Sequence, residues 1–368
     1  RTAELTPRMR EVADTVALAW REVLHLDHTP GHGDDFFDLG GDSLMAMRML
    51  GHVRGKGVEV TPRVFLADPT VAGLARAAVG EEADAATVVA EQDAIPVEDI
   101  ALPLSRGRGR PIFWLHPSGG DVLCYLELAR RLATDRPMIG LADPGLSGHQ
   151  VPPTIEALVE LYLRAIVTEQ PEGPYTVGGW SMGGTVAHEV ARALRRAGHE
   201  VDLVIMLDAN SPERIIRLTG QNTERVWLRH LRSTEAFLGL DLGEIDDVDH
   251  LTSALVDAGV LGSKETLAER VAVFERHLVA LGEHRAGVLA DTPVLLLRAD
   301  EKSPRNGGEG MGVDDIDEPD LGWGPWVTGA FDVHGVPAHH YSILRDPALQ
   351  HVVPLIDAAL DARTGNRS

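Results

Sequence analysis

Two different patterns of apolar residues divide the chain. In the first 80 residues, apolar positions recur at helical spacing, as at Val16, Trp20 and Val23 of a helix expected over about residues 5–24. From about residue 104 onward, short apolar runs alternate with longer amphipathic ones. The first pattern predicts a small all-α domain. The second predicts an α/β domain with a mostly parallel sheet and helices on both faces.

Two further helices are predicted in the first domain. Asp42 and Ser43 are suited to cap one of them, which has an apolar face beginning at Leu44. The last helix is expected to begin near Thr70, directly after a proline. The stretch 80–103 is acidic and Ala-rich, contains two prolines and has no sustained period. It is therefore predicted to link the two domains.

Six apolar runs are predicted to form the strands of the second domain. These runs are residues 111–115, 138–141, 174–179, 201–208, 292–300 and 331–336. Residues 209–290 break this rhythm, because they contain several helical patterns and no convincing strand. The interval is predicted to be either a helical insertion or an enlarged crossover between two strands.

Composition and charge exclude several functions. The chain has 368 residues, enough for two domains, and a formal net charge of −22. We expect no nucleic-acid partner, because phosphates require a basic surface. We expect no membrane partner either, because no apolar stretch is long enough to span a bilayer. The single cysteine rules out an intrachain disulfide and favours a reducing, cytoplasmic location. The abrupt start without Met indicates a piece of a longer polypeptide.

The stretch VGGWSMGGT at residues 177–185 places Ser181 at the centre of a Gly-x-Ser-x-Gly motif. The motif follows an apolar strand and opens a helix, and its glycines permit the sharp turn of a nucleophile elbow. The alternative is a serine that only caps the helix, and the strand–motif–helix context favours the nucleophile. A serine hydroxyl needs a base, an orienting acid and an anion site to attack an acyl group.

Two acids and two histidines are candidates to activate Ser181. Asp208 and Asp300 each follow a predicted strand, and only one of them is needed to orient the base. The base is expected after the last strand, where His339 and His340 are adjacent. One of the two is expected to be catalytic and the other to line the entrance. Their spacing matches no metal-binding motif, so we expect no metal there.

The anion site needs backbone N–H groups at the tip of the first apolar strand and directly after the nucleophile. The sequence HPSGG places Ser118 and Gly119 at such a tip, and Met182 supplies the second N–H. The helical interval begins just after the candidate acid Asp208. We therefore expect it to act as a lid over the site.

The first domain resembles a known family. FFDLGGDSLMAMRML, residues 36–50, is similar to the phosphopantetheine-attachment motif of peptidyl carrier proteins in nonribosomal peptide synthetases. The similarity extends over residues 8–79. It implies a four-helix carrier bundle at residues 4–79, with 4′-phosphopantetheine attached covalently to Ser43. It also implies a phosphopantetheinyl transferase as a partner, with condensation and adenylation domains upstream in the same assembly line.

Residues 104–366 resemble the type I thioesterase domains that end such assembly lines. The similarity is carried by PIFWLHPSGG, GPYTVGGWSMGGTVAHEVA, VIMLDANSPE and GVPAHHYSIL. It implies an α/β-hydrolase fold with a helical lid at about residues 211–290. One departure is the long Gly- and acid-rich segment 306–326, which is either a solvated loop or a wall of the acyl pocket through Trp323 and Trp326.

The resemblance also assigns the candidate site residues. It selects Asp208 as the acid and His340 as the base for Ser181. It places the oxyanion donors at the N–H groups of Ser118 and Met182.

Together the two resemblances imply a terminal carrier–thioesterase. Ser181 would take a tethered peptidyl chain from phosphopantetheine on Ser43 as an ester. It would then release the chain by hydrolysis, macrocyclisation or oligomerisation. Two alternatives are a free-standing serine esterase with an unmodified helical appendage, and a carrier and docking module without catalysis.

Overall fold

The computed structural model describes residues 5–84, 95–150, 153–219, 250, 253–254, 264–301 and 318–364. The chain forms two compact units. The first comprises Arg1–Ile95 and Thr252–Ala268, and the second comprises Pro96–Leu251 and Glu269–Ser368. Each unit contains its own group of fully buried aromatic side chains, Trp20 and Phe36 in the first and Trp114 and Tyr125 in the second.

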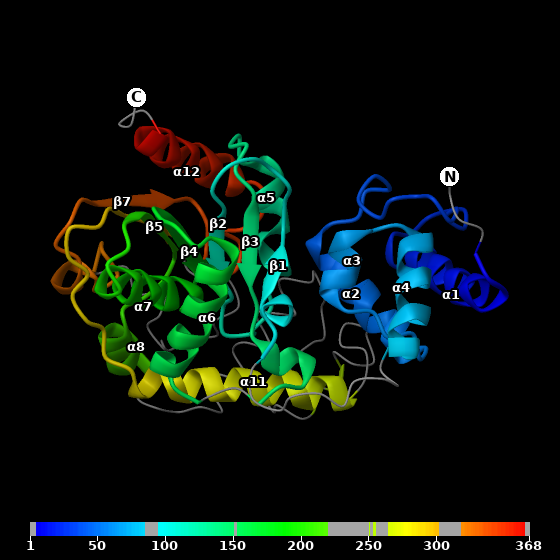
Figure 1. The fold of residues 1–368 in the computed structure, drawn as a ribbon. Helices are drawn as coiled ribbons and strands as arrows, with labels where there is room; N and C mark the ends of the chain where they lie inside the picture. Colours follow the sequence, from blue (N-terminus) through cyan, green and yellow to red (C-terminus); the bar gives the residue numbers. More distant parts are fainter. Residues whose placement is uncertain are drawn as a thin grey trace. The chain divides into compact units, whose positions relative to one another are not determined.

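The N-terminal part of the first unit is all helical. It contains α1 (Pro7–Val23), α2 (Ser43–Gly55), α3 (Pro62–Ala67) and α4 (Val71–Asp84) (Figure 1). The side chains of Thr6, Asp42 and Thr61 accept hydrogen bonds from backbone N–H groups in the first turns of α1, α2 and α3. The ring of Phe36 makes edge-on contacts with Trp20 and Phe65, at centroid distances of 5.1 and 5.3 Å. This arrangement confirms the predicted all-α domain.

The second unit is built on a seven-stranded sheet in the order β1-β3-β2-β4-β5-β6-β7. All neighbouring pairs are parallel except β1 and β3. The strands are β1 (Ala101–Pro103), β2 (Ile112–Leu115), β3 (Met138–Leu141), β4 (Tyr175–Trp180), β5 (Val201–Leu207), β6 (Val294–Ala299) and β7 (Phe331–Val336). The six predicted strands are thus present, and the predicted α/β fold class is confirmed.

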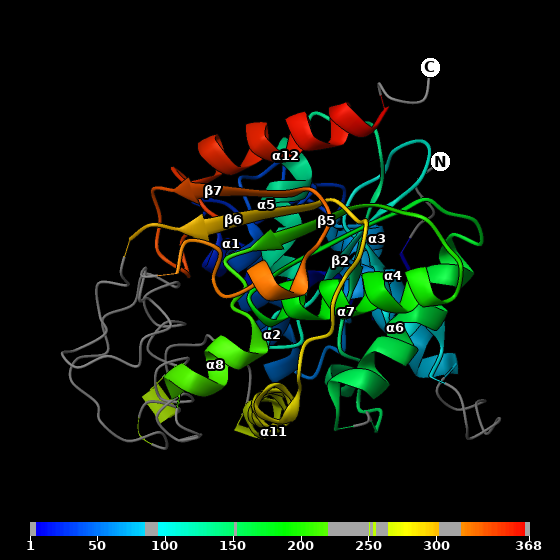
Figure 2. The same ribbon diagram turned by 90° about the vertical axis from the view of Figure 1, so that its left-hand side faces the viewer.

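Helices cover both faces of the sheet (Figure 2). On one face lie α5 (Leu126–Arg131) and α12 (Leu349–Thr364), and on the other lie α6 (Ile155–Glu169) and α7 (Met182–Arg196). Short 3₁₀ turns complete the unit: η1 (Val97–Asp99), η2 (Leu123–Tyr125), η3 (Pro144–Ser147) and η5 (Gly324–Trp326). The buried strands explain why the apolar runs are nearly continuous rather than alternating.

The structure differs from the predicted linker, residues 80–103, at both ends. Helix α4 continues to Asp84, and β1 is an edge strand of the sheet rather than linker. Ala101 and Leu102 are buried and pair with Leu141 and Gly140 of β3. A three-residue strand is too short to show a period of two, so the sequence pattern does not distinguish it from a linker.

Two helices are described in the predicted lid interval, about residues 211–290. They are α8 (Pro212–Thr219) and α11 (Lys264–Glu283). Helix α11 lies on the side of α7 that faces away from the sheet (Figures 1 and 2). Most of the interval between α8 and α11 lies outside the described residues.

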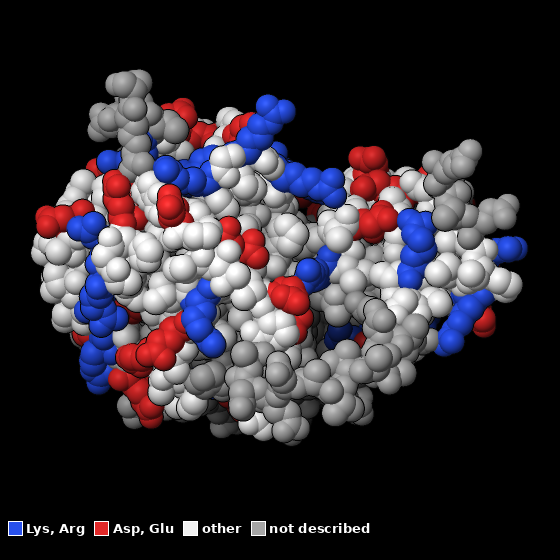
Figure 3. All heavy atoms as spheres, viewed as in Figure 1, with Lys and Arg blue, Asp and Glu red and all other residues white. Residues whose placement is uncertain are grey.

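Figure 3 shows one face of the molecule, on which the coloured Lys and Arg side chains lie among Asp and Glu side chains. None of the described helices combines the length and the apolar character needed to cross a membrane.

Candidate active site

Ser181 lies at the turn between β4 and α7. Its backbone has φ = 56°, a conformation that non-glycine residues adopt rarely and at a cost in free energy. A Cβ on Gly179 would lie 2.2 Å from the carbonyl carbon of Gly183. A Cβ on Gly183 would lie 2.2 Å from the carbonyl oxygen of Leu115. Both glycines are therefore required by the close approach of the helix to the strands, and the turn presents Ser181 beyond the end of β4.

Ser181, His340 and Asp208 form a chain of hydrogen bonds. Nε2 of His340 lies 3.1 Å from Oγ of Ser181, and Nδ1 of His340 donates to Oδ2 of Asp208 at 2.6 Å. The other oxygen of Asp208 accepts from the N–H of Ala299 at 2.8 Å. The three side chains follow β4, β5 and β7, whose carboxyl ends meet at one edge of the sheet. This is the geometry that general-base activation of a serine requires.

The structure places the two alternative residues differently. Asp300 forms an ion pair with Arg298, at 3.1 Å, and its backbone N–H donates to Val336. Nδ1 of His339 accepts from the N–H of Tyr341 at 3.3 Å, within its own loop. Of the two adjacent histidines, His340 is the one whose contacts with Asp208 and Ser181 are found in the described part of the chain.

Trp180 supports His340, and sequence reasoning did not identify it. Its indole N–H donates to the carbonyl of His340 at 3.1 Å, and the two rings lie 5.2 Å apart. Its backbone N–H donates to the hydroxyl of Tyr125 at 2.8 Å, and that hydroxyl donates to the carbonyl of Leu115 at 2.6 Å. The only signal in the sequence is the place of Trp180 inside the serine motif.

The predicted oxyanion donors lie on two different elements. Met182 is the first residue of α7, where backbone N–H groups have no partner within the helix. Ser118 follows β2 in a tight turn closed by a 2.9 Å hydrogen bond from the N–H of Gly120 to the carbonyl of Pro117. Within the described part of the chain, no acceptor is found for the N–H groups of Ser118 and Met182. Both are thus available to a ligand oxygen.

A buried cluster beside this turn was also missed. Donor atoms of His116, Asp143 and His277 all lie within 4.8 Å of one another, the proximity expected of metal ligands. However, each ring nitrogen of the two histidines already contacts a protein oxygen. The cluster is therefore a hydrogen-bonded network. Its members are too far apart in the sequence for any motif to reveal it.

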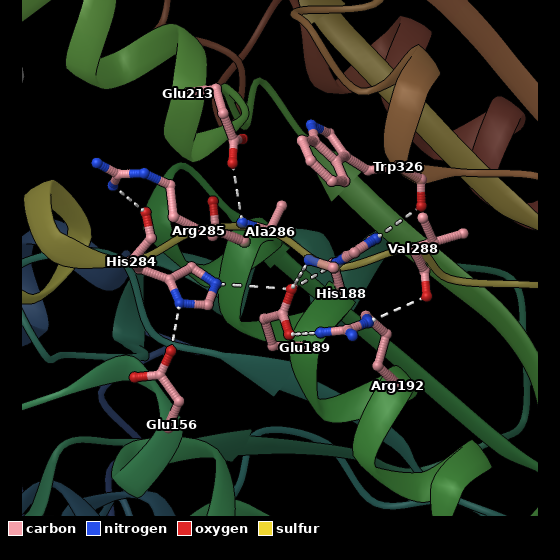
Figure 4. A network of polar contacts seen from close by, with 12 residues as sticks. Glu156, His188, Glu189, Arg192, Glu213, His284, Arg285, Ala286, Val288 and Trp326 are labelled. Carbon is pink, nitrogen blue, oxygen red and sulfur yellow. Dashed lines mark hydrogen bonds and ion pairs between the residues drawn. The ribbon is translucent and has the colours of Figure 1, made fainter.

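A second polar network holds residues 284–288, directly after α11, against α6 and α7 (Figure 4). His284 contacts Glu156 of α6 at 2.7 Å and Glu189 of α7 at 3.6 Å. Arg192 of α7 binds Glu189 and donates to the carbonyl of Val288 at 3.1 Å. Burial alone would lower the pKa of His284, but the two carboxylates outweigh it and raise that pKa above its ordinary value. An imidazolium thus links this end of the insertion to the sheet-covering helices.

Trp323 does not line an open pocket. Its side chain is fully buried, and its indole N–H donates to the carbonyl of Ala209 at 2.7 Å. Its ring also packs against His188 at 4.6 Å. It therefore supports the loop that carries Asp208. Residues 306–317, the first part of the predicted Gly- and acid-rich segment 306–326, lie outside the described residues.

In the first unit, Ser43 is the first residue of α2. Asp42 caps the helix by accepting from the N–H of Met45 at 2.7 Å. A Cβ on Gly41 would lie 2.3 Å from a ring atom of the buried Phe36, so a glycine is needed for the loop to pack this closely. The N-terminus of a helix favours a negative group, because its N–H groups are unpaired and its dipole is positive there. The position therefore fits an anionic phosphodiester on Ser43.

Comparison with known proteins bears on both units. Residues 110–360 match the family model of the thioesterase domain, and residues 14–78 match that of the phosphopantetheine attachment site. A dimodular nonribosomal peptide synthase of Bacillus subtilis (strain 168) is 40% identical over 192 residues, which are 51% of this chain and 8% of that protein. Enterobactin synthase component F of Escherichia coli (strain K12) is 28% identical over 348 residues, 94% of this chain and 24% of that protein.

A solved structure shares the fold. A four-domain nonribosomal peptide synthetase, crystallised with AMP and glycine, matches with a TM-score of 0.60 at 24% identity. The match covers 97% of this chain and 27% of that one. The chain thus spans about a quarter or less of the length of the two curated relatives.

Proposed function

Because this chain belongs to the thioesterase domain family and carries a phosphopantetheine attachment site ahead of that domain, we propose that it is the terminal carrier–thioesterase of a nonribosomal peptide synthetase. It would release a peptidyl chain that is bound as a thioester. The observation that carries the proposal is the hydrogen-bonded chain Ser181–His340–Asp208 in the thioesterase region.

The first step is acyl transfer to Ser181. Attached to Ser43, phosphopantetheine would supply the thiol that holds the peptidyl chain as a thioester. Oγ of Ser181 attacks the acyl carbon while Nε2 of His340 takes the hydroxyl proton. Asp208 holds the imidazole in the correct tautomer and stabilises the imidazolium. As the carbon–sulfur bond breaks, His340 returns this proton to the departing sulfur, and a peptidyl ester remains on Ser181.

The oxyanion of this step requires hydrogen-bond donors. We assign that role to the N–H groups of Ser118 and Met182, which are free of other acceptors in the described part of the chain. Removal of one such donor in other enzymes lowers kcat by about 10²–10³. The N-terminus of α7 adds a positive dipole at the same place.

The second step removes the chain from Ser181. His340 takes a proton from the incoming nucleophile, which attacks the ester carbonyl, and the proton is then given to Oγ of Ser181. Water gives the free acid. An amine or hydroxyl of the same chain gives a ring, and one from a second chain gives an oligomer. In each case the lid at about residues 211–290 would determine which nucleophile reaches the ester.

Tethering explains how weak contacts between the carrier and the thioesterase would suffice. A short flexible linker holds its cargo at an effective concentration on the order of millimolar. The partners in this proposal are a phosphopantetheinyl transferase, the upstream condensation and adenylation domains, and the tethered peptide. The free thiol needed on the carrier and the single cysteine both suit a reducing, cytoplasmic compartment.

The proposal is tested by loading a synthetic peptidyl-pantetheine onto the protein with a phosphopantetheinyl transferase. We expect the wild-type protein to gain the mass of the peptidyl-pantetheine and then to release the product. The Ser43→Ala variant should show no mass gain, and the Ser181→Ala variant should release no product. Mass spectrometry of the product then distinguishes acid, ring and oligomer. No mass gain together with rapid turnover of untethered esters would indicate a free-standing esterase, and no release by loaded protein would indicate a docking module.

A further inference from the structure

Two buried histidines from distant parts of the chain lie in contact beside the turn that carries Ser118. His116 directly follows β2, and His277 belongs to α11. Both are fully buried, and their rings are stacked, with centroids 4.9 Å apart and an interplanar angle of 25°. Neither histidine has a role in the proposed reaction so far. Two stacked imidazoles in the same interior repel each other if both are charged, so at most one of them carries a charge.

His116 is the neutral member of the pair. Burial and the neighbouring His277 lower the pKa of His116 to about 4. Its Nδ1 lies 2.7 Å from the carbonyl oxygen of Pro117, which accepts only, so Nδ1 carries the proton and donates. Its Nε2 is then free to accept from the hydroxyl of Tyr162.

His277 is the charged member. Its Nδ1 lies 2.7 Å from the carbonyl oxygen of Ser118, and its Nε2 lies 2.7 Å from Oδ2 of Asp143. Both partners accept only, so both nitrogens must carry a proton. Arg276 also binds Asp143, at 2.8 and 2.9 Å. Burial would raise the pKa of Asp143, but the hydrogen bond from His277 and the positive charges around it hold that pKa well below its ordinary value.

These bonds determine where two backbone N–H groups point. A peptide unit is planar and trans, so its N–H points opposite to its carbonyl. His116 holds the carbonyl of Pro117, which shares a peptide unit with the N–H of Ser118. His277 holds the carbonyl of Ser118, which shares a peptide unit with the N–H of Gly119. Both N–H groups are therefore directed away from the imidazole pair.

We infer that His277, an imidazolium held by Asp143 and Arg276, is a positioning residue: by holding the carbonyl of Ser118 it fixes the turn that presents the Ser118 N–H to the acyl oxygen. The inference rests on the proposed function, since it assumes that this turn binds the acyl oxygen. The bond from His277 to Ser118 also connects the helical insertion to the anion site, because His277 belongs to α11 and lies 159 residues from Ser118 in the sequence. Movement of α11 would then release the Ser118 carbonyl and misalign the anion site.

Two substitutions separate the two bonds of His277. The amide nitrogen of Asn can replace Nδ1, so His277→Asn keeps a donor toward Ser118. The longer Gln can replace Nε2, so His277→Gln keeps the donor toward Asp143 only. Both variants remove the same charge. His149→Gln is the matched control, because His149 pairs with Asp99 at 2.8 Å outside the site.

The measurement is the rate of acyl-enzyme formation from a short peptidyl-pantetheine thioester. We expect His277→Gln to lower kcat by roughly ten- to a hundredfold with KM unchanged, because a misplaced donor acts mainly on the transition state. The kcat of His277→Asn should be much closer to that of the wild type, and the kcat of His149→Gln should equal it. Arg276→Gln, at a partly exposed position, should lower kcat by a smaller factor, and it provides the test if neither variant at position 277 folds.

Equal losses of kcat in His277→Gln and His277→Asn would overturn the inference. A wild-type kcat in His277→Gln would overturn it as well. If only Arg276→Gln folds, a wild-type kcat in that variant would do the same. Failure of the proposed function would look different. In that case wild-type protein would form no covalent adduct with a fluorophosphonate, or Ser181→Ala would form the same adduct. The two results are therefore distinguishable in one set of proteins.

Discussion

Nδ1 of His340 lies 2.6 Å from Oδ2 of Asp208, although 132 residues separate the two in the sequence. The contact forms because β5 and β7 end at the same edge of the sheet, with β6 between them. The backbone N–H of Ala299, at the end of β6, holds the second oxygen of Asp208. The carboxylate is therefore fixed from both sides.

We expect Asp208→Asn to lower kcat for acyl-enzyme formation by roughly 10³- to 10⁴-fold, because an amide stabilises the wrong tautomer of the base. Asp300→Asn is the matched control. Asp300 follows the neighbouring strand β6 but pairs with Arg298, so its substitution should leave kcat near the wild-type value. Stopped-flow measurement of the acyl-enzyme burst compares the two variants. An equal loss in Asp300→Asn would contradict the assignment of the acid.

The adjacent histidines give a second prediction. His340→Ala should abolish reaction of Ser181 with a fluorophosphonate on the time scale of the wild type, because no other base contacts Oγ among the described residues. His339→Ala should retain labelling, since Nδ1 of His339 accepts a hydrogen bond from the N–H of Tyr341, whereas Nε2 of His340 contacts Oγ of Ser181. Intact-protein mass spectrometry follows the adduct. Fast labelling of His340→Ala with slow labelling of His339→Ala would reverse the assignment.

The third prediction concerns Gly183, two residues after Ser181 in the Gly-x-Ser-x-Gly motif. Gly183→Ala should lower the free energy of unfolding by about 1–3 kcal/mol, because its methyl group would lie 2.2 Å from the carbonyl oxygen of Leu115. Gly282→Ala in α11 is the control, since a methyl group there would have no described atom within 4 Å apart from its chain neighbours and the backbone of its own helix. Helix propensity alone should then stabilise it by up to about 1 kcal/mol. Denaturant unfolding measures both, and an unchanged stability of Gly183→Ala would contradict the packing argument.

The fourth prediction is a pH dependence of the network in Figure 4. The pKa of His284 is raised above its ordinary 6.5, so its ionic contacts with Glu156 and Glu189 stabilise the folded state fully below pH 6.5. This contribution is lost as the pH rises through the folded-state pKa. The pKa of Glu189 is lowered from its ordinary 4.5 despite burial, so its own contribution is present above pH 4.5 and is lost in acid.

The test compares wild type with His284→Gln in denaturant unfolding across pH 5–9. The difference in unfolding free energy should be largest near pH 5–6 and should shrink above 6.5. His188, Arg192 and Glu213, which also contact this network, are the same in both proteins. A difference that grows with pH would show that His284 is neutral in the folded state.

The sequence alone was sufficient for the fold class and the nucleophile candidate. Strand runs such as 201–208 are continuous in apolar residues because both faces of the sheet are covered, and this signal is local. The strand–Gly-x-Ser-x-Gly–helix pattern is also local, since the glycines are needed within a few residues of Ser181. In the same way, Asp42 and Ser43 predicted the start of α2 by capping.

The tertiary structure decided the contacts between distant segments. The residues alone left two acids and two histidines open, and the meeting of β5 and β7 at one edge brings Asp208 to His340. The edge strand β1 is too short to show a period, so only its pairing with β3 reveals it. The bond from His277 to Ser118 joins α11 to the end of β2. Spacing in the sequence carries no information about such pairs, because packing of separate elements determines them.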